Sequence, residues 1–188
     1  MCAPVWQAPG VQIYGDVRLA EGVSLWPNAV MRAESHYIEI GTNTNVQDFA
    51  MIHIGGAPSI IGAFCSITHH ATVHGAVIGD NCLIGINATI MDGAEIGANS
   101  IVAGHAIVRE GEKVPPNSVV AGVPGKVVAT RNNYVANRIN AYAYLENAQA
   151  YAAGNYRRWA EPEYEAKMAE LALALERDLE SGLEQASQ

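Results

Sequence analysis

The sequence predicts a mainly β chain, built as a coil of short parallel strands and followed by α-helices at its C-terminal end. Aliphatic residues recur every six positions over residues 11–127, and glycine, asparagine and aspartate recur between them. The period stops after Gly125, where a helical pattern begins. A fixed short period of this kind is typical of solenoid architectures. We therefore expect a coil domain of residues 1–128 and a helical extension of residues 129–188.

The period of six is clearest in the second half of the coil. Eight aliphatic side chains recur there without interruption: Ile78, Ile84, Ile90, Ile96, Val102, Val108, Val114 and Val120. A helix needs a period near 3.6 and a strand one near 2, so a period of six indicates a short strand plus a turn. Three such units close a triangular coil with the aliphatic side chains inside. Gly, Asn and Asp suit the left-handed backbone conformations that its corners require.

The C-terminal part of the chain has a different pattern. Residues 131–153 and 163–184 are rich in Ala, Leu, Glu, Arg and Tyr, and Gly154 and Asn155 separate them. In the second segment a leucine recurs every fourth residue, at Leu171, Leu175, Leu179 and Leu183. We expect two helices, of which the first packs against the coil. The leucine stripe indicates a core or subunit interface rather than a cofactor site.

Composition excludes several function classes. The net charge of -8 argues against a nucleic-acid partner, which would require a basic surface. No apolar run approaches the roughly 18 residues of a membrane span, and the first residues resemble no signal peptide. Three cysteines without framework spacing fit a reducing compartment. We therefore expect a cytoplasmic protein without a membrane partner.

The breaks in the period show which residues lie above one another. The intervals 31–40 and 52–61 each carry three extra residues, and the interval 73–78 is one residue short. Counting with these breaks stacks three inward side chains: Met31, Ile52 and Val73. The residues that follow them form a second column: Arg32, His53 and His74. Neighbouring strands lie about 4.8 Å apart, so two imidazoles in one column can bind one ion.

A third histidine lies on another face of the coil. The same counting places His69 directly above Asp48 and one face away from the column of His53 and His74. A metal ion shared by all three histidines would therefore take His69 from a neighbouring copy of the chain. A cyclic trimer would build three equal sites of this kind at its interfaces.

The remaining histidines and two cysteines are expected to have structural roles. We expect His36 and His105 to be solvated surface side chains and His70 to have a structural or outer-shell role. Cys65 and Cys82 each lie four places after an inward aliphatic residue, in adjacent coils. They are expected to be buried thiols rather than a disulfide or metal ligands.

Residues 32–53, RAESHYIEIGTNTNVQDFAMIH, followed by His69-x4-His74-Gly, resemble the γ-class carbonic anhydrases and their relatives among the hexapeptide-repeat proteins. The shared segments are Arg-x-acid, TN-x-QD, His, and His-x4-His. The resemblance implies a left-handed parallel β-helix. It also implies a homotrimer in which two metal-binding histidines come from one subunit and one from the next.

The resemblance further implies a metal cofactor and a reaction. His53, His69 and His74 would hold Zn²⁺, for which Fe²⁺ or Co²⁺ can substitute in the family. Three neutral imidazoles leave the ion its full charge and an open position. Water bound there has its pKa lowered from about 15.7 towards 7, and the resulting hydroxide can attack carbon dioxide to give bicarbonate.

Four other residues match the family's motif. The resemblance implies that Gln47 contacts the hydroxide or bicarbonate and that Asn45 orders its surroundings. It assigns Arg32 and Asp48 to the subunit interface, where Arg32 either meets bicarbonate or forms only an ion pair with Asp48. The acid after Arg32 is Glu34, whereas the family commonly has Asp there.

One departure from the family keeps other functions open. The archetypal enzyme has an acidic loop after the first metal histidine, and residues 55–59 contain no carboxylate to transfer protons. His70 or His36 could substitute as the proton carrier. The alternatives are an acyltransferase that uses acyl-CoA and a single histidine base, and a metal-binding trimer with an accessory role. The TN-x-QD segment and the three histidines favour the metalloenzyme.

Overall fold

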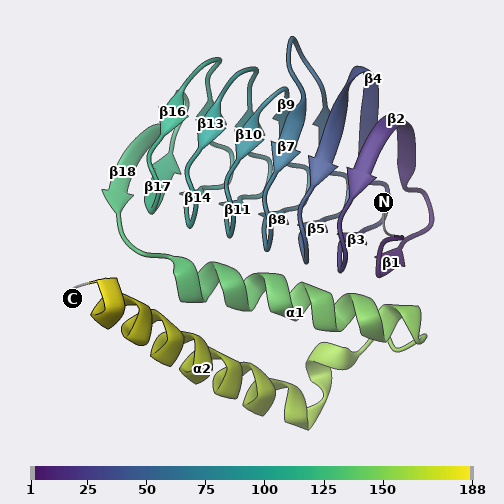
Figure 1. Ribbon diagram of the computed structural model, residues 1–188. Helices are drawn as coiled ribbons and strands as arrows, with labels where there is room; N and C mark the ends of the chain where they lie inside the picture. Colours follow the sequence, from purple (N-terminus) through teal and green to yellow (C-terminus); the bar gives the residue numbers. More distant parts are fainter. Residues whose placement is uncertain (1–2, 187–188) are drawn as a thin grey trace.

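The computed structural model describes residues 3–186, with side chains through residue 182, as a coil of parallel strands flanked by two helices (Figure 1). One sheet forms one face of the coil: β1 (Trp6–Gln7), β3 (Ser24–Leu25), β5 (Asn45–Val46), β8 (Ser66–Ile67), β11 (Leu83–Ile84), β14 (Ile101–Val102), β17 (Ser118–Ala121) and β18 (Lys126–Thr130). Its strands are parallel except for the pairing of β17 with β18. The mainly β fold with C-terminal helices, predicted from the period of six, is confirmed.

The second sheet forms the other two faces and bends at β4 (Val30–Ile40), which β2 (Gln12–Leu19) flanks. One face continues from β4 through β6 (Met51–His53), β9 (Thr72–His74), β12 (Thr89–Ile90) and β15 (Ile107–Val108). The other continues through β7 (Ser59–Ile61), β10 (Val77–Ile78), β13 (Glu95–Ile96) and β16 (Lys113–Val114). β18 crosses the domain boundary expected at residue 128, so that division remains a prediction.

The core is a set of stacked aliphatic side chains inside the coil. Ile52 and Val73, for example, are fully buried and lie in register with each other. Full burial of such a side chain contributes about 1.5–3 kcal/mol relative to exposure. The corners carry the left-handed conformations that the sequence predicts. At one corner five residues have φ near 60°: Asn28, Phe49, His70, Asn87 and His105.

The breaks in the period appear as local irregularities of the coil. The register of β2 on β4 jumps from Gly15 opposite Ala33 to Asp16 opposite Tyr37. Residues 34–36 therefore bulge out of β4, and Glu34 lies in this bulge. The second insertion forms the loop between β6 and β7. The sequence predicts these irregularities correctly because each inward aliphatic side chain fixes the register of its strand.

The C-terminal segment forms α1 (Tyr134–Ala152), the 3-10 turn η1 (Arg158–Ala160) and α2 (Pro162–Ala186). α1 packs along the face that contains β1, β3, β5 and β8, as expected. Asn137 Nδ2 donates to the carbonyls of Asn81 (2.9 Å) and Ser100 (3.2 Å), and Ser66 Oγ donates to Asn140 Oδ1 at 2.7 Å. These bonds satisfy polar atoms that burial would otherwise leave unpaired.

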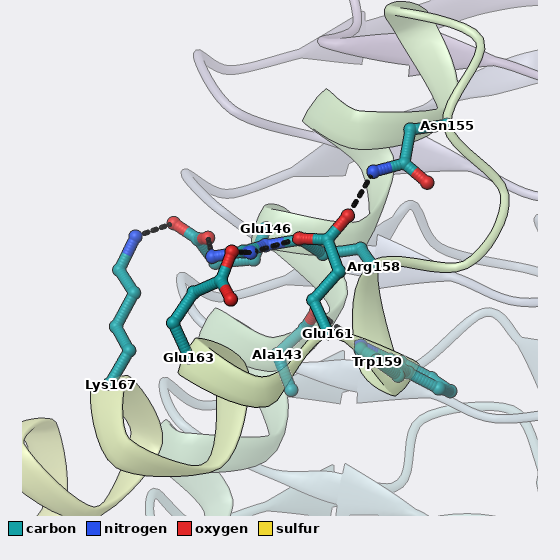
Figure 2. A network of polar contacts seen from close by, with 8 residues as sticks. All are labelled: Ala143, Glu146, Asn155, Arg158, Trp159, Glu161, Glu163 and Lys167. Carbon is teal, nitrogen blue, oxygen red and sulfur yellow. Dashed lines mark hydrogen bonds and ion pairs between the residues drawn. The ribbon is translucent and has the colours of Figure 1, made fainter.

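An ionic network joins α1, η1 and α2 (Figure 2). We call it the guanidinium cluster, and it comprises Glu146, Arg158, Glu161, Glu163 and Lys167. The Trp159 ring lies beside it, and its Nε1 donates to the carbonyl of Ala143 at 3.3 Å. The cluster fixes the start of α2 on α1.

The leucine stripe of α2 is only partly covered in a single chain. Leu175 is buried, whereas Leu173 beside the stripe is 55% exposed. Leu183 lies outside the described side chains, and an interface role for the stripe remains a prediction. Within residues 3–186, none of the helices combines the length and apolarity that crossing a bilayer requires.

The two coil cysteines are packed as the sequence predicts. Cys65 and Cys82 are free thiols and fully buried, and the backbone N–H of Cys82 donates to Cys65 Sγ at 3.4 Å. Burial is the main cause that raises the pKa of the Cys65 thiol well above its ordinary value, and it outweighs the backbone hydrogen bond from Cys82, which lowers that pKa. The Cys65 thiol therefore stays protonated and unreactive at neutral pH.

Candidate metal centre

The column of residues predicted from the period exists in the coil. Arg32 of β4 pairs with His53 of β6, and His53 pairs with His74 of β9, in parallel register. The two imidazoles lie on the outside of the same face. His53 Nδ1 lies 3.0 Å from His74 Nε2. Strand register alone thus brings together two histidines that are twenty-one residues apart.

The other nitrogen of each ring faces a carboxylate. His53 Nε2 lies 3.1 Å from Glu34 Oε2, and His74 Nδ1 lies 2.8 Å from Asp92 Oδ2. We call these four residues, Glu34, His53, His74 and Asp92, the imidazole cluster. Burial raises the pKa of Glu34, but the hydrogen bond with His53 and the charge of Arg32 outweigh it, so the pKa is lowered. Glu34 is therefore an ionised acceptor at neutral pH.

These carboxylates determine which ring nitrogens carry protons. A carboxylate only accepts, so the nitrogen that faces it carries the proton and the other nitrogen of a neutral ring presents a lone pair. His53 Nδ1 and His74 Nε2 therefore direct two lone pairs at each other across 3.0 Å. Neutral rings in this arrangement repel each other unless a cation lies between them.

His69 lies at the corner that follows β8, away from the imidazole cluster. Its Nδ1 donates to Asp48 Oδ2 at 3.0 Å, which leaves Nε2 as the acceptor. The side chain of His69 is 38% exposed, so a neighbouring molecule can reach it. The structure confirms that Asp48 lies beneath His69 and that the three histidines do not meet within one chain.

A cavity of about 230 Å³ adjoins His69 and Asp48. Its aromatic wall is formed by Trp26, Tyr144, Tyr151 and Trp159. Burial, followed by the nearby charge of Asp48, raises the pKa of Tyr144 to about 12. Tyr144 therefore remains a neutral phenol in the wall of the cavity beside His69.

Gln47 and Asn45 lie on the same half of the site as His69. Asn45 lies in β5 and Gln47 directly follows this strand, and both side chains are almost fully buried. Gln47 Nε2 donates to Asn45 Oδ1 at 2.9 Å, and Asn45 Nδ2 donates to Ser66 Oγ at 3.0 Å. This chain of bonds fixes the Gln47 amide and leaves its Oε1 as an acceptor.

Arg32 pairs within the chain with Glu34 rather than with Asp48. Glu34 thereby bridges Arg32 and His53, a contact that its place in the bulge of β4 makes possible. The sequence identified Glu34 only as a departure at the interface. The ring of His70 stacks on Phe49 at 4.9 Å and an angle of 3°, and its structural or outer-shell role remains a prediction.

Asp92 is the member of the imidazole cluster that the sequence analysis does not single out. A signal for it exists in the period, because Ile90 pairs with Val73 and so places Asp92 one coil above Gly75, the residue that follows His74. Recognising it requires knowing that the side chain turns back along the coil, and the period carries no such information.

The chemistry of the three histidines fits that of metal-binding imidazoles. Each of the three imidazoles donates one N–H to a carboxylate, which is the usual support of a metal-binding histidine. Two nitrogens bound to one tetrahedral Zn²⁺ lie about 3.3 Å apart, close to the separation found here. Among residues 3–186, no single-chain group of three or more His, Cys, Asp or Glu side chains is arranged to hold a metal. Within the described residues, His53 and His74 would thus be the two imidazole ligands that one chain offers to an ion at this place.

Comparison with known proteins identifies a family profile, curated relatives and solved structures that are similar to this chain. The profile of the family described as "Bacterial transferase hexapeptide (six repeats)" matches residues 75–110. A protein named "Probable carbonic anhydrase" from Methanocaldococcus jannaschii is 49% identical over 142 residues, which cover 74% of this chain and 89% of that protein. "Gamma carbonic anhydrase 3, mitochondrial" from Arabidopsis thaliana is 42% identical over 84% of this chain and 64% of its own length. Several further curated relatives are matched over about half of their length or less.

A solved structure supports the same architecture. The hexapeptide transferase family protein from Anaplasma phagocytophilum superposes with a TM-score of 0.70 and 26% identity, over 79% of this chain and 92% of that chain. The coil is thus common to carbonic anhydrases and transferases, so the fold alone does not separate the two activities. The distinction depends on the residues at the site.

Proposed function

This chain belongs to the γ-class carbonic anhydrase family of hexapeptide-repeat proteins, and we propose that it is itself a metal-dependent carbonic anhydrase. It would hydrate carbon dioxide reversibly to bicarbonate at sites shared between the subunits of a cytoplasmic homotrimer. The observation that carries the proposal is the pair of facing lone pairs on His53 and His74, each fixed by a carboxylate on the far side of its ring.

The metal ion would be held by His53 and His74 of one subunit and by His69 of the next. Zn²⁺ suits three imidazoles, and Fe²⁺ or Co²⁺ are the alternatives. When bound, the ion would supply a hydroxide nucleophile at neutral pH. Asp48 would keep His69 in the tautomer whose Nε2 is free to bind, and Glu34 and Asp92 would do the same for the other two rings.

The neighbouring half of the site would orient the reactants. Gln47 is fixed by Asn45, so its Oε1 can accept a hydrogen bond from the O–H group that attacks carbon dioxide. A fixed acceptor at this point orients the nucleophile without reorganisation during the reaction. Arg32 is held by Glu34 at the edge of the same face, where its positive charge can attract the bicarbonate product.

The transferase and accessory alternatives make different predictions for the same protein. A transferase needs one histidine base and no metal, and three imidazoles each supported by a carboxylate exceed that need. An accessory trimer would bind the metal without fast hydration. Metal analysis of the purified protein together with stopped-flow hydration therefore separates all three. One metal per subunit with hydration supports the enzyme, whereas metal without hydration supports the accessory role and absence of metal overturns the site.

Subunit complementation tests whether the site is shared. His69→Ala and His74→Ala each remove a different half, so each variant alone should lose metal and activity. When the two are mixed in equal amounts, unfolded and refolded together, about a quarter of the interfaces recover both intact halves. We expect about a quarter of the wild-type activity in the mixture, and none in a mixture of His53→Ala with His74→Ala. Equal recovery in both mixtures, or none in either, would contradict a shared site.

A further inference from the structure

The side chain of Asp92 contacts His74 from the next turn of the coil domain. Thr89 and Ile90 of β12 pair with Thr72 and Val73 of β9, so residue 92 lies one coil above Gly75 rather than beside His74. The carboxylate turns back along the coil axis, and its Oδ2 accepts the Nδ1 proton of His74 at 2.8 Å. The two side chains come from adjacent turns of the coil and meet on its outer surface.

Two glycines make room for this carboxylate. A Cβ at Gly55 would lie 1.4 Å from Asp92 Oδ1, and a Cβ at Gly75 would lie 2.4 Å from the same atom. Gly55 is in the loop that follows His53, and Gly75 directly follows His74. Gly56, the next residue of the loop, has open space around it. Residues 55–59 contain no carboxylate of their own, and Gly55 in this loop packs against the carboxylate of Asp92.

A contribution to the stability of the fold does not explain why the Asp92 carboxylate is placed here. Its second oxygen, Oδ1, is buried and is one of the few side-chain atoms in the described part of the chain that have no hydrogen-bond partner. Leaving a buried polar atom unpaired is unfavourable, so such atoms usually have another explanation. Asp80 offers the contrast, because its Oδ1 packs against Gly62 and also accepts the backbone N–H of Ala63 at 2.8 Å.

We infer that Asp92 is a positioning residue of the metal centre, which fixes the His74 tautomer and ring orientation, and that Gly55 and Gly75 are the residues that admit it. The inference rests on the proposed metal site and adds its outer support. By holding the proton on Nδ1, Asp92 leaves the Nε2 lone pair aimed at the ion. Any side chain at position 55 displaces the carboxylate and releases the ring.

The first test measures zinc affinity and the His74 tautomer. Purified wild-type protein, Asp92→Ala and Asp92→Asn are titrated with Zn²⁺ against a chromophoric chelator. We expect Asp92→Ala to weaken zinc binding about 10–100-fold, the usual cost of losing such a partner. Asn keeps an acceptor oxygen without the charge, so Asp92→Asn should recover part of the loss. In the metal-free protein, ¹⁵N NMR should find the His74 proton on Nδ1 in wild type and a mixture of tautomers in Asp92→Ala.

The second test uses neighbouring glycines as a matched pair. Gly55→Ala should weaken zinc binding as much as Asp92→Ala, whereas Gly56→Ala should bind zinc like wild type. Asp80→Ala controls for the loss of any corner aspartate, and it should lower the melting temperature and leave zinc affinity unchanged. The metal-free Asp92→Ala protein loses the hydrogen bond from His74 Nδ1 together with a buried oxygen that has no partner, so its melting temperature is measured to show that it folds.

The outcomes separate this inference from the proposed function. If wild type binds zinc and Asp92→Ala binds it equally tightly, the role of Asp92 is wrong and the metal site stands. If Gly55→Ala behaves like Gly56→Ala, the glycine requirement is wrong. If wild type binds no zinc, the proposed function fails, and an unchanged His74 tautomer in metal-free Asp92→Ala would overturn the positioning role as well.

Discussion

The imidazole cluster on the coil and the guanidinium cluster at the helix junction are both ionic, yet they differ in how completely their atoms are paired. In the guanidinium cluster, Arg158 contacts three carboxylates, and Lys167 contacts one of these at 2.6 Å (Figure 2). In the imidazole cluster, two lone pairs face each other and one carboxylate oxygen has no partner. The first is complete within the chain, and the second would be completed by the cation of the proposed site.

The difference shows how function is distinguished from stability in this molecule. Folded proteins normally pair their buried polar atoms, so a fully paired cluster needs no explanation beyond structure. Unpaired atoms that converge from several strands indicate a missing partner. Changes in the guanidinium cluster should therefore alter stability and leave metal binding intact, whereas changes in the imidazole cluster should do the reverse.

The largest effect on stability is expected from Arg158→Ala. It removes the centre of the guanidinium cluster and leaves Glu146, Glu161 and Glu163 close together without their shared cation. We expect the melting temperature to fall by about 2–4 °C, the shift that the loss of a modest interaction causes in a chain of this size. Differential scanning calorimetry at low and high salt measures it. The difference from wild type should shrink as salt screens the charges.

Arg18→Ala is the matched control for Arg158→Ala. Arg18 pairs with Asp16 at 2.6 Å, but both side chains are at least 43% exposed, and such pairs contribute little. We expect no measurable change in its melting temperature. A loss of bound zinc in Arg158→Ala would contradict the separation of the two clusters.

A smaller, pH-dependent effect is expected from Glu161→Gln. The hydrogen bonds from Arg158 and Asn155 lower the pKa of Glu161 below its ordinary value of 4.5. A lowered carboxyl pKa stabilises the folded state above pH 4.5, and this contribution is lost as the pH falls through the folded-state value. Wild type should therefore be more stable than Glu161→Gln at pH 7, and the difference should vanish in acid. Urea denaturation across pH 3–7 tests this, and a gap that widens below pH 4.5 would contradict it.

The sequence predicts the coil well because each rung repeats one physical constraint. In the regular rungs, a two-residue strand that ends in an inward aliphatic residue and is followed by a tight turn leaves little freedom, so counting alone predicts that His53 lies under His74. The contacts of Glu34 and Asp92 were not predicted, because both come from places where the chain departs from the repeat or turns back across it. Side-chain direction at a bulge or corner depends on local space, such as that beside Gly55, which no period encodes.

The smallest effect is expected from His70→Asn, which tests how protons leave the site. His70 has φ of 58° at a corner where Asn28 and Asn87 occupy the equivalent positions, so asparagine keeps the backbone conformation. Its ring stacks on Phe49 and makes no contact with the imidazole cluster, so we expect stability within about 0.5 kcal/mol of wild type. Zinc content and the hydration rate should be unchanged in both concentrated and dilute buffer. A rate that falls only in dilute buffer, and recovers when free imidazole is added, would instead show that His70 carries protons to solvent in place of the missing acidic loop.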